Sequence, residues 1–113
     1  MKKLYRIRKN EEFSSIIEKK KTISSSCFLL YIDDKKMDYS RIGISVSKKL
    51  GDAVVRNKIK RQVRMMFLNI YDFNSSNIDI ICIVRPKYLE NSFSFNQLEL
   101  EKVIKKAIIN KYK

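Results

Sequence analysis

The chain has 113 residues, of which 25 are lysine or arginine and 12 are aspartate or glutamate, so its formal net charge is +13. This length corresponds to about one domain, and so much like charge destabilises a compact fold unless a polyanion neutralises it in use. The two cysteines and the lack of histidine exclude a Cys/His zinc site and a dense disulfide framework, so Cys27 and Cys82 are expected to be reduced core thiols.

A short helix is predicted near the N-terminus. Phe13, Ile16 and Ile17 recur at helical spacing, and Asn10 stands where its side chain can cap the first turn. Two acidic residues directly after Asn10 are placed favourably near the positive end of the helix dipole. The helix is expected to end near the lysine run at 19–21.

Strand-like patterns follow this helix. The pattern changes at Thr22, and residues 27–32 form an apolar, β-branched and aromatic run typical of a mostly buried strand. A turn is expected at 35–38. Residues 41–47 then alternate, with branched apolar side chains on one face. The other face carries small side chains and is expected to leave room for a ligand: Gly43, Ser45 and Ser47.

A long helix and a buried strand make up the next part of the chain. After Gly51 the pattern takes the period of a helix that runs to about Tyr71, followed by a polar turn at 74–77. Residues 78–84 are apolar on both faces, as expected of a central strand that is reached by a helical crossover. Pro86 ends this strand.

The last predicted element is a helix. Ser94 and Gln97 have the spacing of a capping box, and an apolar stripe follows at helical spacing: Leu100, Val103, Ile104, Ala107 and Ile108. The order of helix, strands, helix, strand and helix predicts an α/β fold with one central sheet and helices packed on it. We expect residues 1–113 to form a single compact domain.

No segment has the pattern of a signal peptide, a membrane span or a linker. The N-terminus is basic, but no apolar run of signal-peptide length follows it, and no run approaches the roughly 18 residues that span a bilayer. The chain has only two glycines and one proline and no internal repeat. We therefore expect a cytoplasmic protein, with nucleic acid as the first candidate partner and an anionic membrane as the second.

The long helix is predicted to have a basic face. At about 100° per residue, an apolar stripe falls on one side of it: Val55, Ile59, Val63, Met66 and Ile70. The opposite side carries five polar residues: Arg56, Asn57, Lys60, Arg61 and Arg64. A solvated face usually mixes both signs of charge, whereas Asp52 is the only acidic residue between Lys48 and Arg64. Phosphates would supply the missing negative charge, which predicts an RNA-binding surface centred on this helix.

The sequence offers no catalytic group. Without histidine there is no imidazole base, and the scattered acidic residues form no paired carboxylates or metal-ligand pattern of the kind that nucleases need. Asp33 and Asp34 are adjacent, so on a strand their side chains point to opposite faces. We expect no catalytic residue and no metal ligand in this chain, and we assign any catalysis to a partner.

Two blocks of sequence closely resemble the bacterial ribonuclease P protein family. The first is RIGISVSKKLG at 41–51, and the second is AVVRNKIKRQVR at 53–64, which matches the arginine- and asparagine-rich signature of that family. Weaker similarity extends through residues 8–13, 28–31 and 80–86. The resemblance therefore covers most of the chain.

This resemblance implies a fold, a partner and a role. It implies the order αβββαβα with an unusual left-handed crossover, where patterning alone favours the right-handed form. It also implies binding to the ribonuclease P RNA, which carries out the Mg²⁺-dependent removal of the 5′ leader from precursor tRNA. The residues that match the surface facing the catalytic RNA are Lys48, Lys49, Arg56, Asn57, Lys58, Lys60, Arg61 and Arg64. The Mg²⁺ is then expected to be held mainly by the RNA.

The resemblance also implies a cleft for the single-stranded leader. Phe13 and Tyr31 match aromatic positions of that cleft, where stacking is worth about 1 to 3 kcal/mol per contact; taken alone, both residues would be read as core packing. Ile17 stands where the family often has a second aromatic residue, so apolar packing is expected there. Ser45 and Ser47 complete the predicted cleft. At Lys58 the signature commonly has arginine, but a point charge suffices at the edge of the basic face.

Other functions compete with this interpretation. A structural RNA-binding protein of ribosomal type, without a role in cleavage, would share the charge and the α/β fold. A helix-turn-helix DNA regulator is less favoured, because strands rather than a short helix flank the basic helix. Membrane binding is the least favoured, because the sheet needs the apolar stripe opposite the cations. The expected partners are therefore ribonuclease P RNA and precursor tRNA, without DNA or a membrane.

Overall fold

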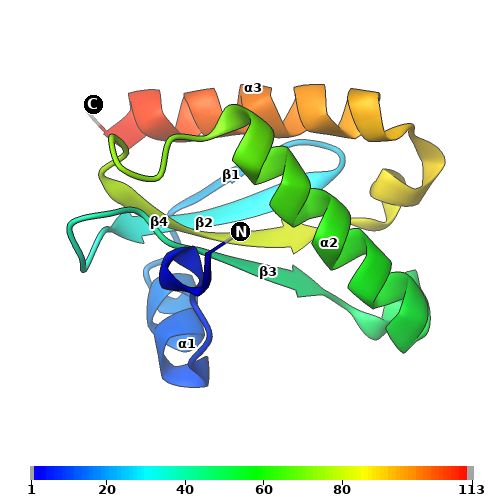
Figure 1. Ribbon diagram of the computed structural model, residues 1–113, viewed down its shortest axis with the longest axis horizontal. Coiled ribbons are helices and arrows are strands. Elements are labelled where there is room, and N and C mark those ends of the chain that lie inside the picture. The colour runs from blue at the N-terminus through cyan, green and yellow to red at the C-terminus, as the bar shows by residue number, and fades with distance from the viewer. Residues whose placement is uncertain (1, 112–113) are drawn as a thin grey trace.

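The computed structural model describes residues 2–111 and contains one four-stranded sheet with helices on both of its faces (Figure 1). The main elements are α1 (Asn10–Glu18), β1 (Thr22–Ser24), β2 (Phe28–Asp34), β3 (Ile42–Val46), α2 (Ala53–Ile70), β4 (Ile78–Val84) and α3 (Phe93–Lys111). Three short 3₁₀ turns accompany them: η1 (Lys3–Tyr5), η2 (Lys48–Leu50) and η3 (Pro86–Glu90). The predicted order αβββαβα is confirmed.

The sheet has the strand order β1-β2-β4-β3, in which β4 runs antiparallel to β2 and parallel to β3. Helix α2 connects the two parallel strands. In Figure 1 both strands point to the right, α2 passes in front of the sheet, and the chain moves upward from β3 to β4. This crossover is left-handed, as the family resemblance implied and against the general preference for the right-handed form.

The main core lies between the sheet and the layer formed by α2 and α3. Alternate residues of the strands face this layer, and both helices contribute buried side chains: Ile59, Val63, Met66 and Phe67 from α2, and Leu100, Val103, Ile104 and Ala107 from α3. Cys27 and Cys82 are buried in the same core and are not joined in a disulfide, as predicted. Burial raises the pKa of the Cys82 thiol, which keeps it protonated.

Both predicted helix caps are wrong. Asn10 is already the first helical residue of α1, and the residue before it makes no side-chain cap hydrogen bond. Helix α3 begins at Phe93, so Ser94 lies inside its first turn, and the hydroxyl of Ser92 instead accepts a hydrogen bond from the backbone N–H of Phe95 at 3.2 Å. Caps depend on which of several neighbouring polar residues takes the non-helical position.

One residue of the predicted apolar stripe is misplaced. Val55 is exposed, because it lies in the first turn of α2 and packs over Gly51 instead of over the sheet. Phe67, which the predicted stripe did not contain, is fully buried. None of the helices within the described part of the chain is long and apolar enough to cross a membrane.

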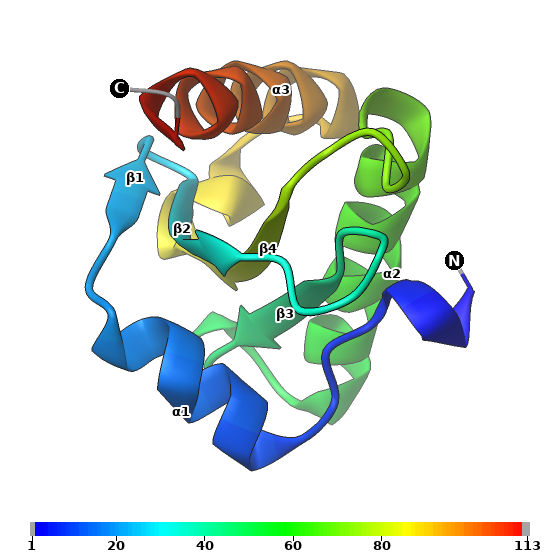
Figure 2. The same ribbon diagram turned by 90° about the vertical axis from the view of Figure 1, so that its left-hand side faces the viewer.

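The other face of the sheet is only partly covered, by α1 (Figure 2). A second, smaller apolar cluster lies there: Ile7, Ile16 and Ile81 are buried, and Phe13, Tyr31 and Ile83 are partly buried against them. This is the face on which the sequence predicted a cleft.

Candidate nucleic-acid interface

Helix α2 holds its basic residues at the surface. The carboxylate of Asp52 accepts a hydrogen bond from the backbone N–H of Val55 at 3.0 Å and so caps the first turn. The apolar stripe fixes the helix to the sheet. On the opposite side Asn57, Lys58 and Arg61 are exposed, and Arg56, Lys60 and Arg64 are half-buried. The structure therefore separates a core face from a cation face on one helix, as the sequence predicted.

Acidic side chains of the described residues do little to neutralise the cations of this face. Among the ion pairs that the structure gives for residues 2–111, none includes a lysine or arginine of α2. The Nε atom of Arg56 is buried without a hydrogen-bond partner. Lys48 and Lys49 lie in η2, directly before the helix, and are exposed. The basic surface thus runs from η2 along α2, and an anionic partner would satisfy it.

Phe13 of α1 lies against Gly43 of β3. A Cβ atom at Gly43 would be 2.5 Å from Cζ of Phe13 and 2.9 Å from Cδ1 of Ile81. Any side chain at this position would therefore clash with the Phe13 ring, and only glycine allows the observed packing. The small-residue face of β3 was predicted to leave room for a ligand. That prediction is wrong at Gly43, because the Phe13 ring fills the space.

Beside this contact lies the partly covered sheet face on which the cleft is predicted. In the strand register, Tyr31, Ile81 and Gly43 form one cross-strand row. Side chains of α1 bury Ile81 and Gly43, whereas Tyr31 stays half-buried. The next row stays half-buried and forms an apolar floor with one hydroxyl: Leu29, Ile83 and Ser45. Ile17, one turn after Phe13, and Ser47, just beyond β3, are exposed. The predicted cleft residues therefore lie around one partly covered face of the sheet.

Leu29 and Ile83 belong to this floor but were missed in the sequence. Both lie in strands with apolar residues on both faces, and such strands do not indicate which face stays open. Only the short length of the first predicted helix could have indicated that it covers this face of the sheet incompletely.

The basic surface and the cleft meet in a small pocket at the edge of the sheet. The backbone N–H of Ile7 donates to the carbonyl of Ile42 at 2.8 Å, so the N-terminal segment runs along β3. The pocket lining includes Phe13 and Gly43 together with three arginines: Arg6, Arg8 and Arg64. Burial and, after it, the charge of Arg6 lower the pKa of Arg64. Arg6 and Arg8 were missed because no local pattern reveals that this segment joins the sheet edge.

The buried carboxylates on this side of the molecule are engaged in ion pairs. Asp33 and Asp79 are cross-strand partners; Asp33 pairs with Lys36 at 3.1 Å and Asp79 with Arg41 at 3.3 Å. Burial opposes the charge of Arg41, but its hydrogen bond to Glu12 and the charge of Asp79 raise the pKa of the guanidinium. Over the described stretch of the chain, no three aspartate, glutamate or cysteine side chains gather in a way that could hold a metal ion.

Comparison with known proteins gives consistent matches. A family model described as Ribonuclease P matches residues 1–108. The ribonuclease P protein component of Mycoplasma capricolum is 46% identical over 100 residues, which cover 88% of this chain and 92% of the relative. That of Geobacillus kaustophilus is 40% identical, covering 95% of this chain and 89% of the relative.

Solved structures agree with these relatives. The RNase P protein of Staphylococcus aureus superimposes with a TM-score of 0.80 at 40% identity, covering 91% of this chain and 94% of that one. The RNase P protein of Thermotoga maritima superimposes with a TM-score of 0.76 at 30% identity, covering 89% of this chain and 96% of that one. The similarity therefore extends over nearly the whole fold that carries the two surfaces.

Proposed function

The chain belongs to the bacterial ribonuclease P protein family, and from this premise we propose that its two adjoining surfaces hold two different RNAs. It is the protein subunit of a ribonucleoprotein endoribonuclease that acts in tRNA 5′ maturation, and its partner is the ribonuclease P RNA. In the proposal, α2 and η2 face that RNA, and the cleft beside α1 receives the 5′ leader of precursor tRNA.

The observation that carries this proposal is the pocket where the two surfaces meet. Phe13 belongs to the cleft and Arg64 to the basic face, and both line the same pocket. A single strand that lies in the cleft would therefore come directly to a group of arginines. Aromatic stacking combined with a cationic path for the backbone is how proteins hold single-stranded RNA.

The metal is assigned to the RNA. The described residues offer no group of three metal-binding side chains, and we propose that Mg²⁺ is held mainly by the RNA. The contribution of the protein is to place cations between the phosphates of ribozyme and substrate, which lowers their repulsion. We propose the cytoplasm as its location, and neither DNA nor a membrane as a partner.

Reconstitution tests the proposal directly. The chain is combined with a bacterial ribonuclease P RNA at low Mg²⁺, and cleavage of a precursor tRNA is followed over time. We expect faster cleavage than with the RNA alone, because the protein replaces part of the charge screening that Mg²⁺ otherwise supplies. A precursor with a leader should also be bound more tightly than mature tRNA. A structural RNA-binding protein would give neither result, and that outcome would remove the proposal.

Tyr31→Ala is expected to weaken binding of the leader. The holoenzyme should lose about 10-fold in affinity for a precursor tRNA and little for mature tRNA, because one stacking partner is removed. Equilibrium binding of both RNAs measures this. Tyr39→Ala is a matched control, since Tyr39 is also half-buried but packs edge-on against Tyr5, with the ring centroids 5.7 Å apart. Equal losses for the two RNAs would place Tyr31 outside the leader path.

A further inference from the structure

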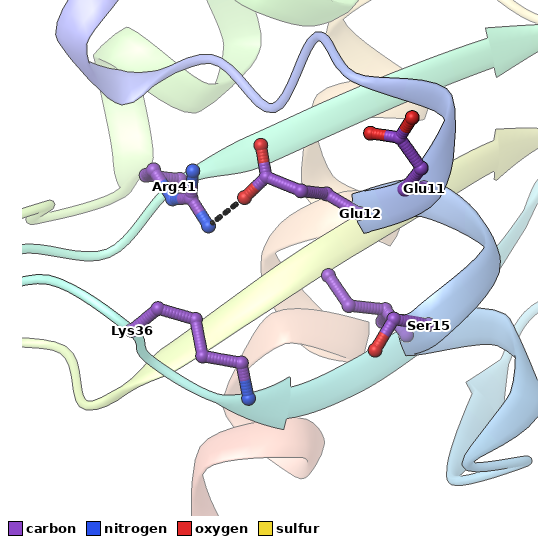
Figure 3. Close-up of a pocket in the computed structure, with 6 residues that line it drawn as sticks. Glu11, Glu12, Ser15, Lys36 and Arg41 are labelled. Carbon is purple, nitrogen blue, oxygen red and sulfur yellow. Dashed lines mark ion pairs between the residues drawn. The ribbon is translucent and has the colours of Figure 1, made fainter.

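We propose that the ion pair between Glu12 and Arg41 positions α1 so that Phe13 and Ile17 stay at the rim of the leader cleft. Glu12 and Arg41 are then positioning residues, which act on leader recognition without touching the leader. This inference rests on the proposed function of the cleft. It concerns the pocket beneath the first turn of α1, which is shown in Figure 3.

Arg41 is a fixed point on the sheet. Its backbone N–H donates to Oδ1 of Asp79 at 2.9 Å, and its Nη2 donates to Oδ2 of the same carboxylate at 3.3 Å. Its carbonyl accepts the backbone N–H of Ile80 at 3.0 Å. The Arg41 side chain is only 8% exposed and that of Asp79 is 0% exposed. Strand β4 therefore holds Arg41 through both its backbone and its side chain.

Glu12 connects α1 to this fixed point. Its Oε2 lies 2.6 Å from Nη2 of Arg41 (Figure 3), and the next residue in the helix is Phe13. Helix α1 has nine residues, no side-chain cap bond at its start, and one buried residue, Ile16. A helix this short is not stable by itself, so its orientation depends on tertiary contacts. The ion pair holds the N-terminal end of α1 on the sheet, and the apolar contacts of Phe13 and Ile16 determine which side of α1 faces the sheet.

The sheet itself does not need Glu12. When Glu12 is lost, Asp79 still accepts from the backbone N–H and from Nη2 of Arg41, so the guanidinium keeps one buried counter-ion. Loss of Arg41, in contrast, would leave Asp79 buried without its cation, which is strongly destabilising. Of the two carboxylates on Arg41, Glu12 is the one that belongs to α1. For this reason Glu12 is the residue to substitute in a test, and Arg41 is not.

The neighbouring residue provides a matched control. Glu11 is exposed, and among the residues drawn in Figure 3 the ion pair with Arg41 is made by Glu12 and not by Glu11. Glu11→Gln and Glu12→Gln each raise the net charge by one unit. If charge alone governed RNA binding, each variant would bind a precursor tRNA as well as the unmodified protein or slightly better, and the two variants would not differ. Positioning predicts a loss for Glu12→Gln and no change for Glu11→Gln.

The test measures the leader contribution, which is the ratio of holoenzyme affinities for a precursor tRNA and for mature tRNA. We expect Glu12→Gln to reduce this ratio by about 5- to 10-fold, which is in the range of one weakened stacking contact. Glu11→Gln should leave the ratio unchanged. Backbone amides of α1 should exchange hydrogen faster in Glu12→Gln than in Glu11→Gln, while the thermal midpoint of the whole domain and its affinity for ribonuclease P RNA stay the same.

A second measurement keeps the inference distinct from general loosening of the fold. If Glu12 acts through Phe13, then Glu12→Gln should have little further effect on the leader contribution once Phe13→Ala is present. Full additivity would overturn the inference. So would equal leader contributions in the two glutamine variants, or a loss of affinity for ribonuclease P RNA in Glu12→Gln. If the unmodified holoenzyme shows no leader contribution at all, it is the proposed function of the cleft that fails.

Discussion

Ile59→Ala is expected to lower the free energy of unfolding by about 2 to 5 kcal/mol. Ile59 is 3% exposed and lies on the stripe by which α2 packs against the sheet. Truncation removes apolar contacts and leaves a cavity that the surrounding strands cannot fill without moving. Urea unfolding at constant ionic strength measures the change. For a domain of this size, such a loss is a large part of the total stability.

Val54→Ala is the matched control for this prediction. Val54 lies in the same helix but is 77% exposed, so its truncation should change the stability by less than about 0.5 kcal/mol. A loss below about 1 kcal/mol for Ile59→Ala would mean that the helix is not held by this stripe. The assignment of the opposite face as the cation surface would then lose its basis.

Arg61→Ala is expected to weaken binding to ribonuclease P RNA by about 10- to 100-fold, the cost of losing charged hydrogen bonds to phosphate. Arg61 is exposed on the cation face, so the fold should be unchanged. Since fewer counterions are released on binding, the slope of log K against log salt should become shallower by about 0.7 to 0.9. Titrations at several salt concentrations measure both quantities.

A second cation separates the effect of this face from that of the overall charge. Lys106 is exposed on α3, so Lys106→Ala removes one positive charge from another part of the surface. We expect a much smaller loss of affinity for the RNA. If both variants lose affinity equally, the RNA responds to net charge and α2 has no special role. If Arg61→Ala unfolds the protein, the two faces of the helix have been assigned wrongly.

The two faces of α2 could be predicted because their pattern repeats. Helix α2 has 18 residues, or about five turns, with apolar residues on one side and cations on the other, so a single exception such as Val55 does not hide the period. The same holds for the apolar stripe of α3. Helix caps were not predictable in this way, because each depends on one residue, and the assignments to Asn10 and Ser94 both failed.

The cleft was less accessible to sequence reasoning. Strands β2 and β4 carry apolar side chains on both faces, so their pattern does not show that α1 leaves Leu29 and Ile83 partly open. The pocket also depends on the N-terminal segment, which reaches β3 through a backbone hydrogen bond that no side-chain pattern encodes. The left-handed crossover followed only from the family resemblance, since general folding rules favour the opposite hand.

The N-terminal segment that runs along β3 also bears on the solubility of the protein. Strand β3 is one outer strand of the sheet, and an unpaired outer strand can add a strand from another molecule and start aggregation. The backbone pairing of Arg6 and Ile7 with Ile42 occupies part of that edge, and the opposite edge is β1, which has only three residues. The same short segment thus brings two arginines to the pocket and protects the sheet from self-association.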